Sequence, residues 1–498
     1  MRDWTGDEAS MEDRIKAAEQ ISCRLVNSRE FEKCIAFVQS SIKDSVDSFT
    51  IRMNEVACYI NRQNWLDAVR TLDDAHEKYN SHGLTESQQH LSIMYYSLVE
   101  QEIGDVDKAE KALRELALLK KEDEIVQFNY SLSLIKKKKY REAIDRLLEI
   151  VIKRPEWGAA YFSVANCYQN LGLDGEAIFW YKQALKKNDA HNVRLNLSLS
   201  LLRSGRFEEG WREFENRPRT WNLDWLRCNW HPGDEIRGKS VAIITDEGIG
   251  DAIMFMPLLA KVVKDSLRHV VYADKRLASV FKRCIPGLII ETRVNDNRYK
   301  EYDVFMRLAS LAGVYYTTKE DIAQRSSYLT CDEVEKKKWA RKLANSKCLR
   351  VGIGWRGGVG RDAIEKRSVP LIEWKILGKG LNVEWISLQH RPDRDQINAA
   401  NSCYNVDIKV FEKLGEDIEE LTALIENLDL IITCEQTVAH IAGALGKECL
   451  VLAASPPGWR YIEDLDIATH RRMLWYKSVT LIRQNDWAIC EKKIKALQ

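Results

Sequence analysis

The sequence lacks the features that mark a membrane, secreted or strongly charged protein. No apolar run approaches the roughly 18 residues of a membrane span, and the charged start, MRDWTGDEASMEDR, contains no apolar core of a secretory signal. Lys and Arg number 75 against 74 Asp and Glu, so no net field favours nucleic acid. The twelve cysteines never stand as CxxC, which argues against zinc knuckles and a disulfide framework. We therefore expect a cytoplasmic protein with reduced thiols, no transmembrane segment and no metal site.

The bulk composition is that of a folded protein with several domains. Of the 498 residues, 45% are hydrophobic and 30% are charged, which is the balance of a globular chain. The length exceeds what one hydrophobic core usually serves, so two to four domains are expected.

Small residues recur at nearly constant spacing through the first two hundred residues. They lie in similar contexts 34, 41, 34, 34 and 33 residues apart, at Cys34, Ala68, Ala109, Ala143, Ala177 and Gly210. A period near 34 with a small residue in the second helix resembles the tetratricopeptide repeat, where small residues let paired helices approach each other. We predict an all-α repeat domain over 1–218, with five or six helix pairs and a concave face that binds a protein partner.

After residue 218 short apolar runs alternate with amphipathic stretches. The strand candidates are 241–245, 269–273, 287–292 and 302–306, and then 350–355, 383–389, 407–411, 428–434, 449–454 and 478–483. Apolar strands separated by helices indicate parallel sheets that are covered on both faces. A charged stretch, 333–347, divides the two series. We predict two doubly wound, Rossmann-like α/β domains, 219–340 and 341–498, which face a cleft at the carboxyl ends of their strands.

The most informative turn of the second series is EQTVAHIAG. A strand candidate ends near Cys434, and Glu435-Gln436 leads into a helix of small residues that begins at Thr437. A helix N-terminus at the carboxyl end of a strand presents N–H groups and the positive end of the helix dipole, which suit a diphosphate. Glu435 would accept hydrogen bonds from ribose hydroxyls. An ordinary strand–helix crossover explains the same residues equally well.

An ordered set of stretches resembles the ADP-heptose:lipopolysaccharide heptosyltransferase family, glycosyltransferases of GT-B fold, joined to tetratricopeptide repeats. The stretches are GKSVAIITDEGIGDAIMFMPLL, VGIGWRGGVGRDAIEKRSVPL, EWISLQ, EQTVAHIAGALG and PPGWRYIED, and the resemblance covers nearly all of 200–490. It implies an inverting, metal-independent transfer of a sugar to an acceptor hydroxyl. The nucleotide-diphosphate sugar donor would be a co-substrate, and no other cofactor is implied.

In the first of these domains the resemblance assigns the catalytic carboxylate. Asp251 of GIGD matches the family's catalytic acid residue, and a carboxylate suits a base that deprotonates the acceptor hydroxyl. Gly248 and Gly250 would let acceptor and sugar approach, and Glu247 borders the same loop. The alternative role for Asp251 is the N-cap of the following helix.

In the second domain the resemblance implies the donor site. Arg367 would neutralise the departing diphosphate, and His440 stands at the family's histidine position; a surface arginine and a buried structural histidine are the alternatives. The other expected donor-binding residues are Trp355, Arg356, Ser368, Gln389, Glu435, Gln436, Thr437, Val438 and Ala439.

The chain departs from the family pattern at two places. Glu435-Gln436 stands where relatives have Asp-Thr or Asp-Ser, so donor binding could differ. Asp246-Glu247 stands where relatives often have Glu-Gln. The added negative charge beside Asp251 is expected to raise the pKa of that carboxyl.

Three other functions fit parts of the sequence. A dinucleotide-dependent oxidoreductase would need a third glycine where Ile253 stands. A metal-dependent transferase would use Asp393-Arg394-Asp395, which has the DxD form. A scaffold protein would keep the repeats and an inactive transferase-like half, as the altered Glu435-Gln436 pair would allow. The residues leave open the sugar, the base and the acceptor, whether a protein, a glycan or a nucleic acid.

Overall fold

The structure, a computed structural model, describes residues 10–80, 83–104, 106–217, 229–245, 247–292, 301–323, 327–344, 348–358, 360–412, 414–463 and 471–498. The chain forms two compact units. The first holds the residues up to 170 together with 186–188, and the second holds 171–185 and everything from 189 onward. This division differs from the predicted domain boundaries at 218 and 340, which remain predictions.

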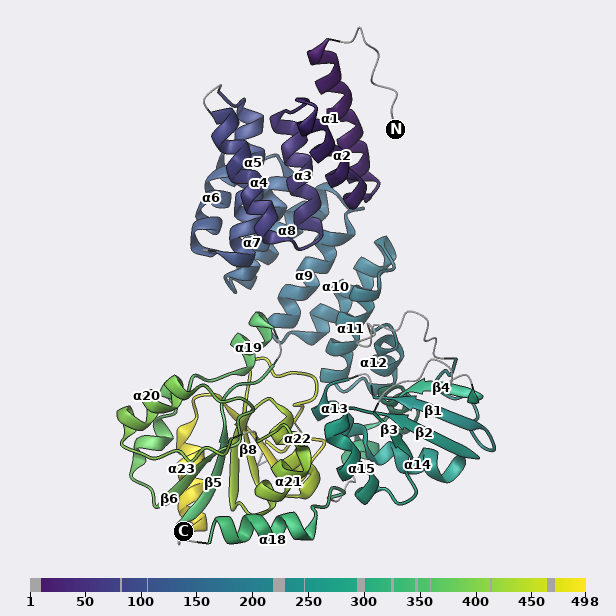
Figure 1. The fold of residues 1–498 in the computed structure, drawn as a ribbon, viewed down its shortest axis with the longest axis vertical. Coiled ribbons are helices and arrows are strands. Elements are labelled where there is room, and N and C mark those ends of the chain that lie inside the picture. Colours follow the sequence, from purple (N-terminus) through teal and green to yellow (C-terminus); the bar gives the residue numbers. More distant parts are fainter. Residues whose placement is uncertain are drawn as a thin grey trace. The chain divides into compact units, whose positions relative to one another are not determined.

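The first unit is entirely helical among its described residues. Its helices are α1 (Met11–Asn27), α2 (Phe31–Lys43), α3 (Phe49–Asn61), α4 (Trp65–Asn80), α5 (Glu86–Ile103), α6 (Val106–Leu119), α7 (Glu124–Lys136), α8 (Tyr140–Lys153) and α9 (Gly158–Asn170). Each helix packs on the next, and α3, α5 and α7 also pack on the odd-numbered helices on either side. Successive hairpins therefore stack side by side, as the purple and blue ribbons of Figure 1 show.

The predicted small residues lie where these helices meet. Cys34, Ala68, Ala109 and Ala143 are at most 1% exposed. The single long interval of 41 residues arises mainly because α5 has 18 residues where its counterpart α7 has 13. The N-terminal region is thus a tetratricopeptide-like helical repeat, as the spacing predicts.

The second unit begins with the last helices of the repeat region. These are α10 (Asp174–Lys187), whose final residues belong to the first unit, α11 (His191–Arg203) and α12 (Phe207–Phe214). Helices α11 and α12 form another packed pair, and α12 also contacts a later helix, α16 (Ala312–Tyr315). Ala177 and Gly210, the last two predicted small residues, are buried as well.

Two parallel sheets follow in the second unit. The first has the order β3-β2-β1-β4, formed by β1 (Ser240–Ile244), β2 (Arg268–Tyr272), β3 (Ile290–Glu291) and β4 (Val304–Arg307). The second has the order β6-β5-β7-β8-β9, formed by β5 (Leu349–Gly354), β6 (Val383–Ser387), β7 (Leu430–Cys434), β8 (Cys449–Ala453) and β9 (Val479–Arg483). Every residue of β1 and β7 is buried, and Figure 1 shows the two sheets with their adjoining helices. The predicted parallel sheets are confirmed.

One predicted strand is wrong. Residues 407–411 form no strand, only a single bridge in which Lys409 pairs with Ile386 of β6. This short apolar run lies at the edge of the sheet, where the adjoining chain pairs for one residue and then leaves. A short apolar run indicates that a segment is buried, but a buried segment need not pair with a neighbouring strand through successive backbone hydrogen bonds.

The helices of the second unit connect and cover these strands. Around the first sheet lie α13 (Ile249–Phe255), α14 (Pro257–Asp265), α15 (Ala278–Cys284), α16 (Ala312–Tyr315) and α17 (Lys319–Ala323). Around the second lie α18 (Glu333–Lys342), α19 (Arg361–Arg367), α20 (Arg394–Tyr404), α21 (Ile418–Glu426), α22 (Thr437–Leu445) and α23 (Trp487–Leu497). No helix in the described part of the chain is long and apolar enough to span a bilayer.

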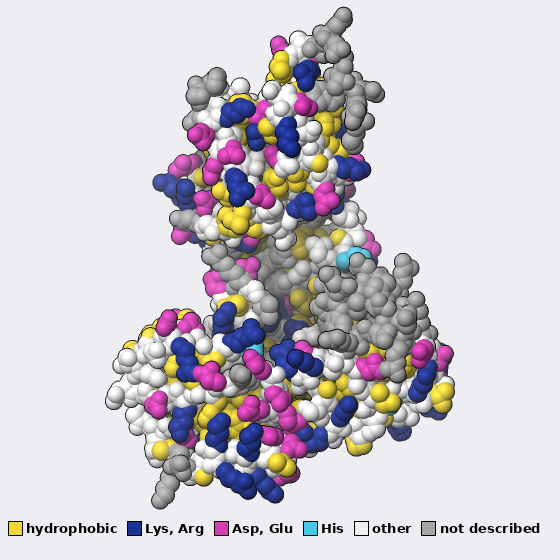
Figure 2. All heavy atoms as spheres, viewed as in Figure 1, with side chains coloured by type: hydrophobic (Ala, Val, Ile, Leu, Met, Phe, Trp, Pro, Cys, Tyr) yellow, Lys and Arg dark blue, Asp and Glu magenta, His cyan; other side chains and the backbone are white. Residues whose placement is uncertain are grey.

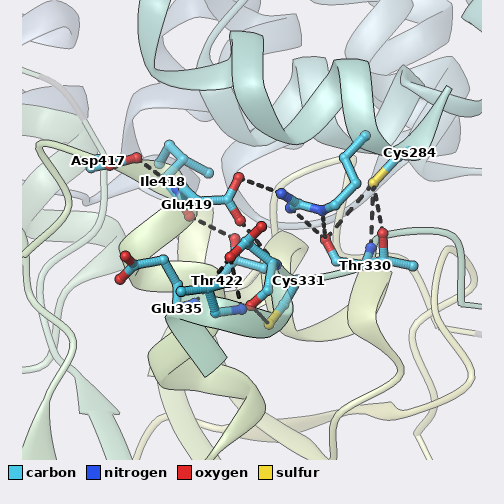
Figure 3. Close-up of polar contacts among 11 residues, drawn as sticks. Cys284, Thr330, Cys331, Glu335, Asp417, Ile418, Glu419 and Thr422 are labelled. Atoms are coloured by element: carbon cyan, nitrogen blue, oxygen red, sulfur yellow. Dashed lines mark hydrogen bonds and ion pairs between the residues drawn. The ribbon is translucent and has the colours of Figure 1, made fainter. Parts of the chain in front are cut away.

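A cluster of polar contacts joins the part of the second unit around the first sheet, its first half, to the part around the second sheet, its second half (Figure 3). Arg283 of α15 donates to Glu419 of α21 at 2.6 Å and to the Thr330 carbonyl at 2.7 Å. The other Glu419 oxygen accepts the N–H of Asp332 at 3.2 Å. One carboxylate thus holds both the first half and the connecting segment to the second sheet.

Candidate active site in the second unit

The strand orders locate the site before any side chain is considered. In the first sheet the winding reverses between β1 and β4, and in the second it reverses between β5 and β7. Doubly wound sheets bind ligands outside the carboxyl ends of strands at such reversal points. The segments that follow β1, β5 and β7 carry most of the predicted site residues.

Asp251 lies in the first turn of α13, the helix that follows β1. Gly248 is the N-cap of this helix, so the alternative N-cap role of Asp251 is wrong. Asp251 is 8% exposed, and both its carboxylate oxygens accept hydrogen bonds from Arg460, with 2.7 Å between Nη2 and Oδ2. Arg460 comes from the loop after β8, so this pair joins the two sheets' halves.

The acidity of Asp251 differs from the sequence-based expectation. Burial favours the neutral acid, but the charge and hydrogen bonds of Arg460 outweigh it and hold the pKa of Asp251 below its ordinary value. Glu247 pairs with Arg217, whose Nε lies 2.7 Å from Glu247 Oε1, and its charge acts on Arg460, the partner of Asp251. Asp246, the other expected neighbour, lies outside the described residues.

Gly250 is required by the contact between α13 and α22. A Cβ added at Gly250 would lie 2.9 Å from His440 Cδ2 and 3.5 Å from Thr437 Cα. The start of α22 therefore packs directly against the GIGD segment, which brings Thr437, Val438 and Ala439 to the same place as Asp251.

His440 is a buried neutral residue in this arrangement. Burial lowers its pKa to about 4. Its Nδ1 lies 3.1 Å from the Tyr476 hydroxyl and its Nε2 3.3 Å from the Tyr461 hydroxyl. The imidazole thus fixes two tyrosines and carries no charge toward a diphosphate at neutral pH.

Glu435 is engaged by backbone donors. It is 1% exposed, and its carboxylate accepts the N–H groups of Ala454 at 2.9 Å and Gly458 at 3.2 Å. Arg367 Nε lies 3.8 Å from Glu435 Oε2, which makes an ion pair. Burial raises the pKa of Glu435, and the Ala454 N–H and Arg367 act against that rise. The carboxylate shapes the turn after β8, and this geometry leaves the predicted ribose contact without support.

The remaining predicted donor residues brace the loop after β5. Gln389 accepts the N–H groups of Trp355 and Arg356 at 3.2 and 2.9 Å and donates to the Arg356 carbonyl. Ser368 Oγ accepts the Gly357 N–H at 3.1 Å. Gln436 donates to Thr433 Oγ1 at 2.7 Å and does not cap α22 through its side chain. These contacts hold the strand ends around the start of α22.

A polar cleft of about 970 Å³ opens beside this cluster. Thr245, Glu247 and Gly248 line it after β1, and the Asp274–Leu277 segment lines it after β2. From the second half it is lined by His390, Arg391 and Glu416. Of the predicted site residues, Glu247 and Gly248 line the cleft and Asp251 does not, but a Cβ added at Gly248 would lie 3.8 Å from Asp251 Oδ2. The volume of the cleft is in the range of small-molecule sites.

In the stretch PPGWRYIED, Trp459 and Arg460 match the Trp-Arg pair of the heptosyltransferase family, for which support packing or a sugar contact was the expected role. The pairing of Arg460 with Asp251 and the contact of Tyr461 with His440 were not predicted. His390 and Arg391 were also missed, although they directly follow Gln389, the last residue of the strand candidate 383–389. Their signal was the general rule that polar residues after parallel strands border a ligand site.

The DxD sequence is a helix cap in the structure. Asp393 precedes α20 and accepts the N–H groups of Asp395 and Gln396 at 3.0 and 3.3 Å. Among the described residues no cluster of three His, Cys, Asp or Glu side chains has a geometry for holding a metal ion.

Comparisons with known proteins add little to this description. No protein-family model matches the chain. The chain is similar to the protein FlbA of Caulobacter vibrioides, with 23% identity over 330 residues, which cover 60% of this chain and 55% of FlbA. The chain therefore spans about half the length of this curated relative.

Similar solved structures overlap the chain in part. A thermophilic TPR protein of Thermus thermophilus, TTC0263, is 14% identical with a TM-score of 0.30, over 34% of this chain and 89% of that one. A structure of the APC/C hetero-tetramer Cut9–Hcn1 is 13% identical with a TM-score of 0.35, over 41% of this chain and 39% of that one. The tetratricopeptide-like character of the N-terminal region is seen in the packing of the chain's own helix pairs.

Proposed function

We propose that the second unit is an inverting, metal-independent glycosyltransferase of GT-B type that uses a nucleotide-diphosphate sugar. The main support is one observation: Asp251, from the reversal point of the first sheet, meets Arg460 and the start of α22, from the second, beside a cleft of about 970 Å³. The ordered resemblance to heptosyltransferases supports the same reaction.

Asp251 acts as the general base in this proposal. The acceptor hydroxyl attacks the anomeric carbon and gives its proton to the Asp251 carboxylate, while the carbon–oxygen bond to the diphosphate breaks and leaves its electron pair on that oxygen. Because attack and departure occur on opposite faces, the anomeric configuration inverts. A carboxylate next to the cleft is suited to this step.

Arg460 and Arg367 provide the positive charge for the departing diphosphate. Both guanidinium groups lower the pKa of Asp251, so both lie near the reacting site. The first N–H groups of α22 face the same region and receive no side-chain cap. The more highly charged diphosphate draws Arg460 away from Asp251, which leaves the carboxylate free to accept a proton.

The repeats recruit the acceptor or a partner protein in this proposal. Stacked helix pairs offer an extended concave face of the kind that binds peptides. On the face that Figure 2 shows, Lys and Arg side chains are interspersed with Asp and Glu, so no field of one sign selects a nucleic acid there. A protein is therefore the acceptor or partner that the repeats favour, over a glycan or a nucleic acid.

Donor binding and donor hydrolysis test this function. We expect one of UDP, ADP, GDP or CDP to raise the melting temperature of the full chain, and the matching sugar donors to be hydrolysed slowly, as detected by mass spectrometry. Asp251→Asn should retain nucleotide binding and lose transfer. Turnover of Asp251→Asn near the wild-type rate would show that another group is the base.

Asp393→Asn is the matched control for this test. Asn also caps helices well, so α20 should be unaffected. We expect full activity, whereas a metal-dependent transferase that uses the DxD carboxylates would lose it.

A scaffold protein with a closed, inactive transferase-like half is the second candidate. One observation favours it: Arg460 already occupies both oxygens of Asp251, and Glu435 is engaged by backbone donors. If no nucleotide stabilises the chain while a protein partner does, the scaffold function is the correct one.

A further inference from the structure

The loop between β8 and β9 that contains Ser455–Arg460, here the 455–460 loop, carries the partner of the base. Two of its residues contact the predicted site residues. The Gly458 N–H donates to Glu435, and Arg460 pairs with Asp251, while the Trp459 ring between them packs on Trp211. The position of this loop therefore sets where Arg460 meets the carboxylate.

The same loop is held from outside by the last repeat helices. Arg203, the final residue of α11, donates from Nη1 to the Pro457 carbonyl at 3.2 Å. A Cβ added at Gly172, just before α10, would lie 3.2 Å from Pro456 Cβ. The Trp211 ring of α12 meets the Trp459 ring edge-on, with centroids 5.5 Å apart. All of these residues belong to the second unit.

Asp174 orients the Arg203 guanidinium. Nε and Nη2 of Arg203 each lie 2.7 Å from an oxygen of Asp174, so the fork is held at two points. The side chains of Arg203 and Asp174 are 11% and 14% exposed. A planar guanidinium fixed in this way aims its remaining nitrogen, Nη1, toward the Pro457 carbonyl.

We propose that Arg203 is a positioning residue, which holds the 455–460 loop through Pro457 and so places Arg460 against Asp251. The repeat region then has a second task besides recruitment, because its last helix pair sets the state of the base. A partner that moves this pair would change catalysis without touching the cleft. The catalytic consequence rests on the proposed function, whereas the coupling to Asp251 does not.

The titration of Asp251 measures this coupling directly. The charged or titratable groups that act most strongly on Asp251 are Arg460, His440 and Arg367. Glu247 acts on Arg460, and the Asp251 charge acts in turn on Tyr461. If the loop loosens, Arg460 holds the carboxylate less tightly, and the pKa of Asp251 must rise because burial then dominates. Carboxyl ¹³C NMR of the full chain follows this pKa, with Asp251→Asn identifying the resonance.

Arg203→Gln is the test variant, and Arg194→Gln is its matched control. Arg194 lies on the same helix and makes a comparable two-point pair with Asp189, at 2.6 and 2.8 Å. It also donates to Glu213 of α12 at 2.9 Å, but no described contact joins it directly to the loop. We expect Arg203→Gln to raise the Asp251 midpoint by about one pH unit, the tenfold change in equilibrium typical of one charge-assisted hydrogen bond. Arg194→Gln should leave it unchanged.

Asp174→Asn keeps the inference testable if Arg203→Gln unfolds. It retains the arginine but weakens the fork, so a smaller shift in the same direction is expected. The coupling would be overturned if the Asp251 midpoint in Arg203→Gln equalled that of the wild-type chain. If only Asp174→Asn folds, an unchanged midpoint in that variant would overturn it. A shift in Arg194→Gln as large as that in Arg203→Gln would overturn it as well.

Activity separates this inference from the proposed function. In an active enzyme the acidic limb of the pH–rate profile should move with the NMR midpoint in Arg203→Gln, which a purely structural residue would not cause. If the wild-type chain turns over no donor, the proposed function fails while the NMR titration still decides the coupling.

Discussion

Replacing Arg460 by glutamine would leave the Asp251 carboxylate buried without its cation. Asp251 is 8% exposed, and Arg460 donates a hydrogen bond to each of its two carboxylate oxygens. Removing one partner of a buried pair costs about 3–5 kcal/mol, because the remaining charge stays desolvated. The Arg460 side chain is 21% exposed, so we expect a loss near the lower end, about 3 kcal/mol.

A double-mutant cycle isolates this term. Asp251→Asn combined with Arg460→Gln removes both charges, so the double variant should regain most of the stability that Arg460→Gln loses. The assay is thermal unfolding of the full chain, followed by tryptophan fluorescence, with a fall on the order of 5 °C expected for Arg460→Gln alone. Arg206→Gln breaks the exposed Arg206–Glu209 pair and should cost less than about 1 kcal/mol.

The pH dependence gives the sign of the effect. The folded-state pKa of Asp251 is lowered, so the pair's contribution to stability is fully present above the unfolded pKa of about 3.9 and is lost as pH falls through the folded value. The difference between wild type and Arg460→Gln should therefore stay constant near neutral pH and shrink in acid. An equal loss in single and double variants, or a difference that grows in acid, would refute this reasoning.

Three further predictions follow from the same cluster. Gly250→Val should separate α13 from α22, because a Cβ there would lie 2.9 Å from His440, and we expect about 1–3 kcal/mol lost in thermal unfolding. Trp211→Ala should lose about 3–5 kcal/mol, because the ring is 2% exposed and its Nε1 donates to the Tyr316 carbonyl at 2.7 Å; unchanged unfolding would contradict the packing with Trp459. The His440 pKa of about 4 means that the unfolded chain binds an extra proton between about pH 4 and 6.5, so stability rises with pH in that window; His440→Gln should flatten this slope, which pH-dependent melting measures.

Much of the fold could be predicted because its signals are local. The 34-residue recurrence of small side chains indicated the helix pairs, since only small residues let paired helices approach. Nine of the ten strand candidates contain a strand of the structure or most of one. The exception, 407–411, has the same apolar character, but it pairs at Lys409 alone, and an edge position is not encoded in residue type.

The candidate site was predictable in its members but not in their partners. Asp251, Thr437 and Glu435 follow buried strands, and this placement is visible in the sequence. Their environments are not. Glu435 receives backbone donors from the turn after β8, and Glu247 pairs with Arg217 at the end of the repeats. The expected rise in the pKa of Asp251 does not occur, because Arg460 outweighs the effect of burial.

The residues along the chain were enough to specify which segments become helices and strands and which turns carry polar groups, because those choices depend on neighbours a few positions away. The pairing of Asp251 with Arg460, 209 residues later, depends on how two sheets and the last repeat helices come together. Ion pairs and burial are set by distances in space, and no local pattern contains them. The acidity of Asp251 is therefore a property of the assembled second unit.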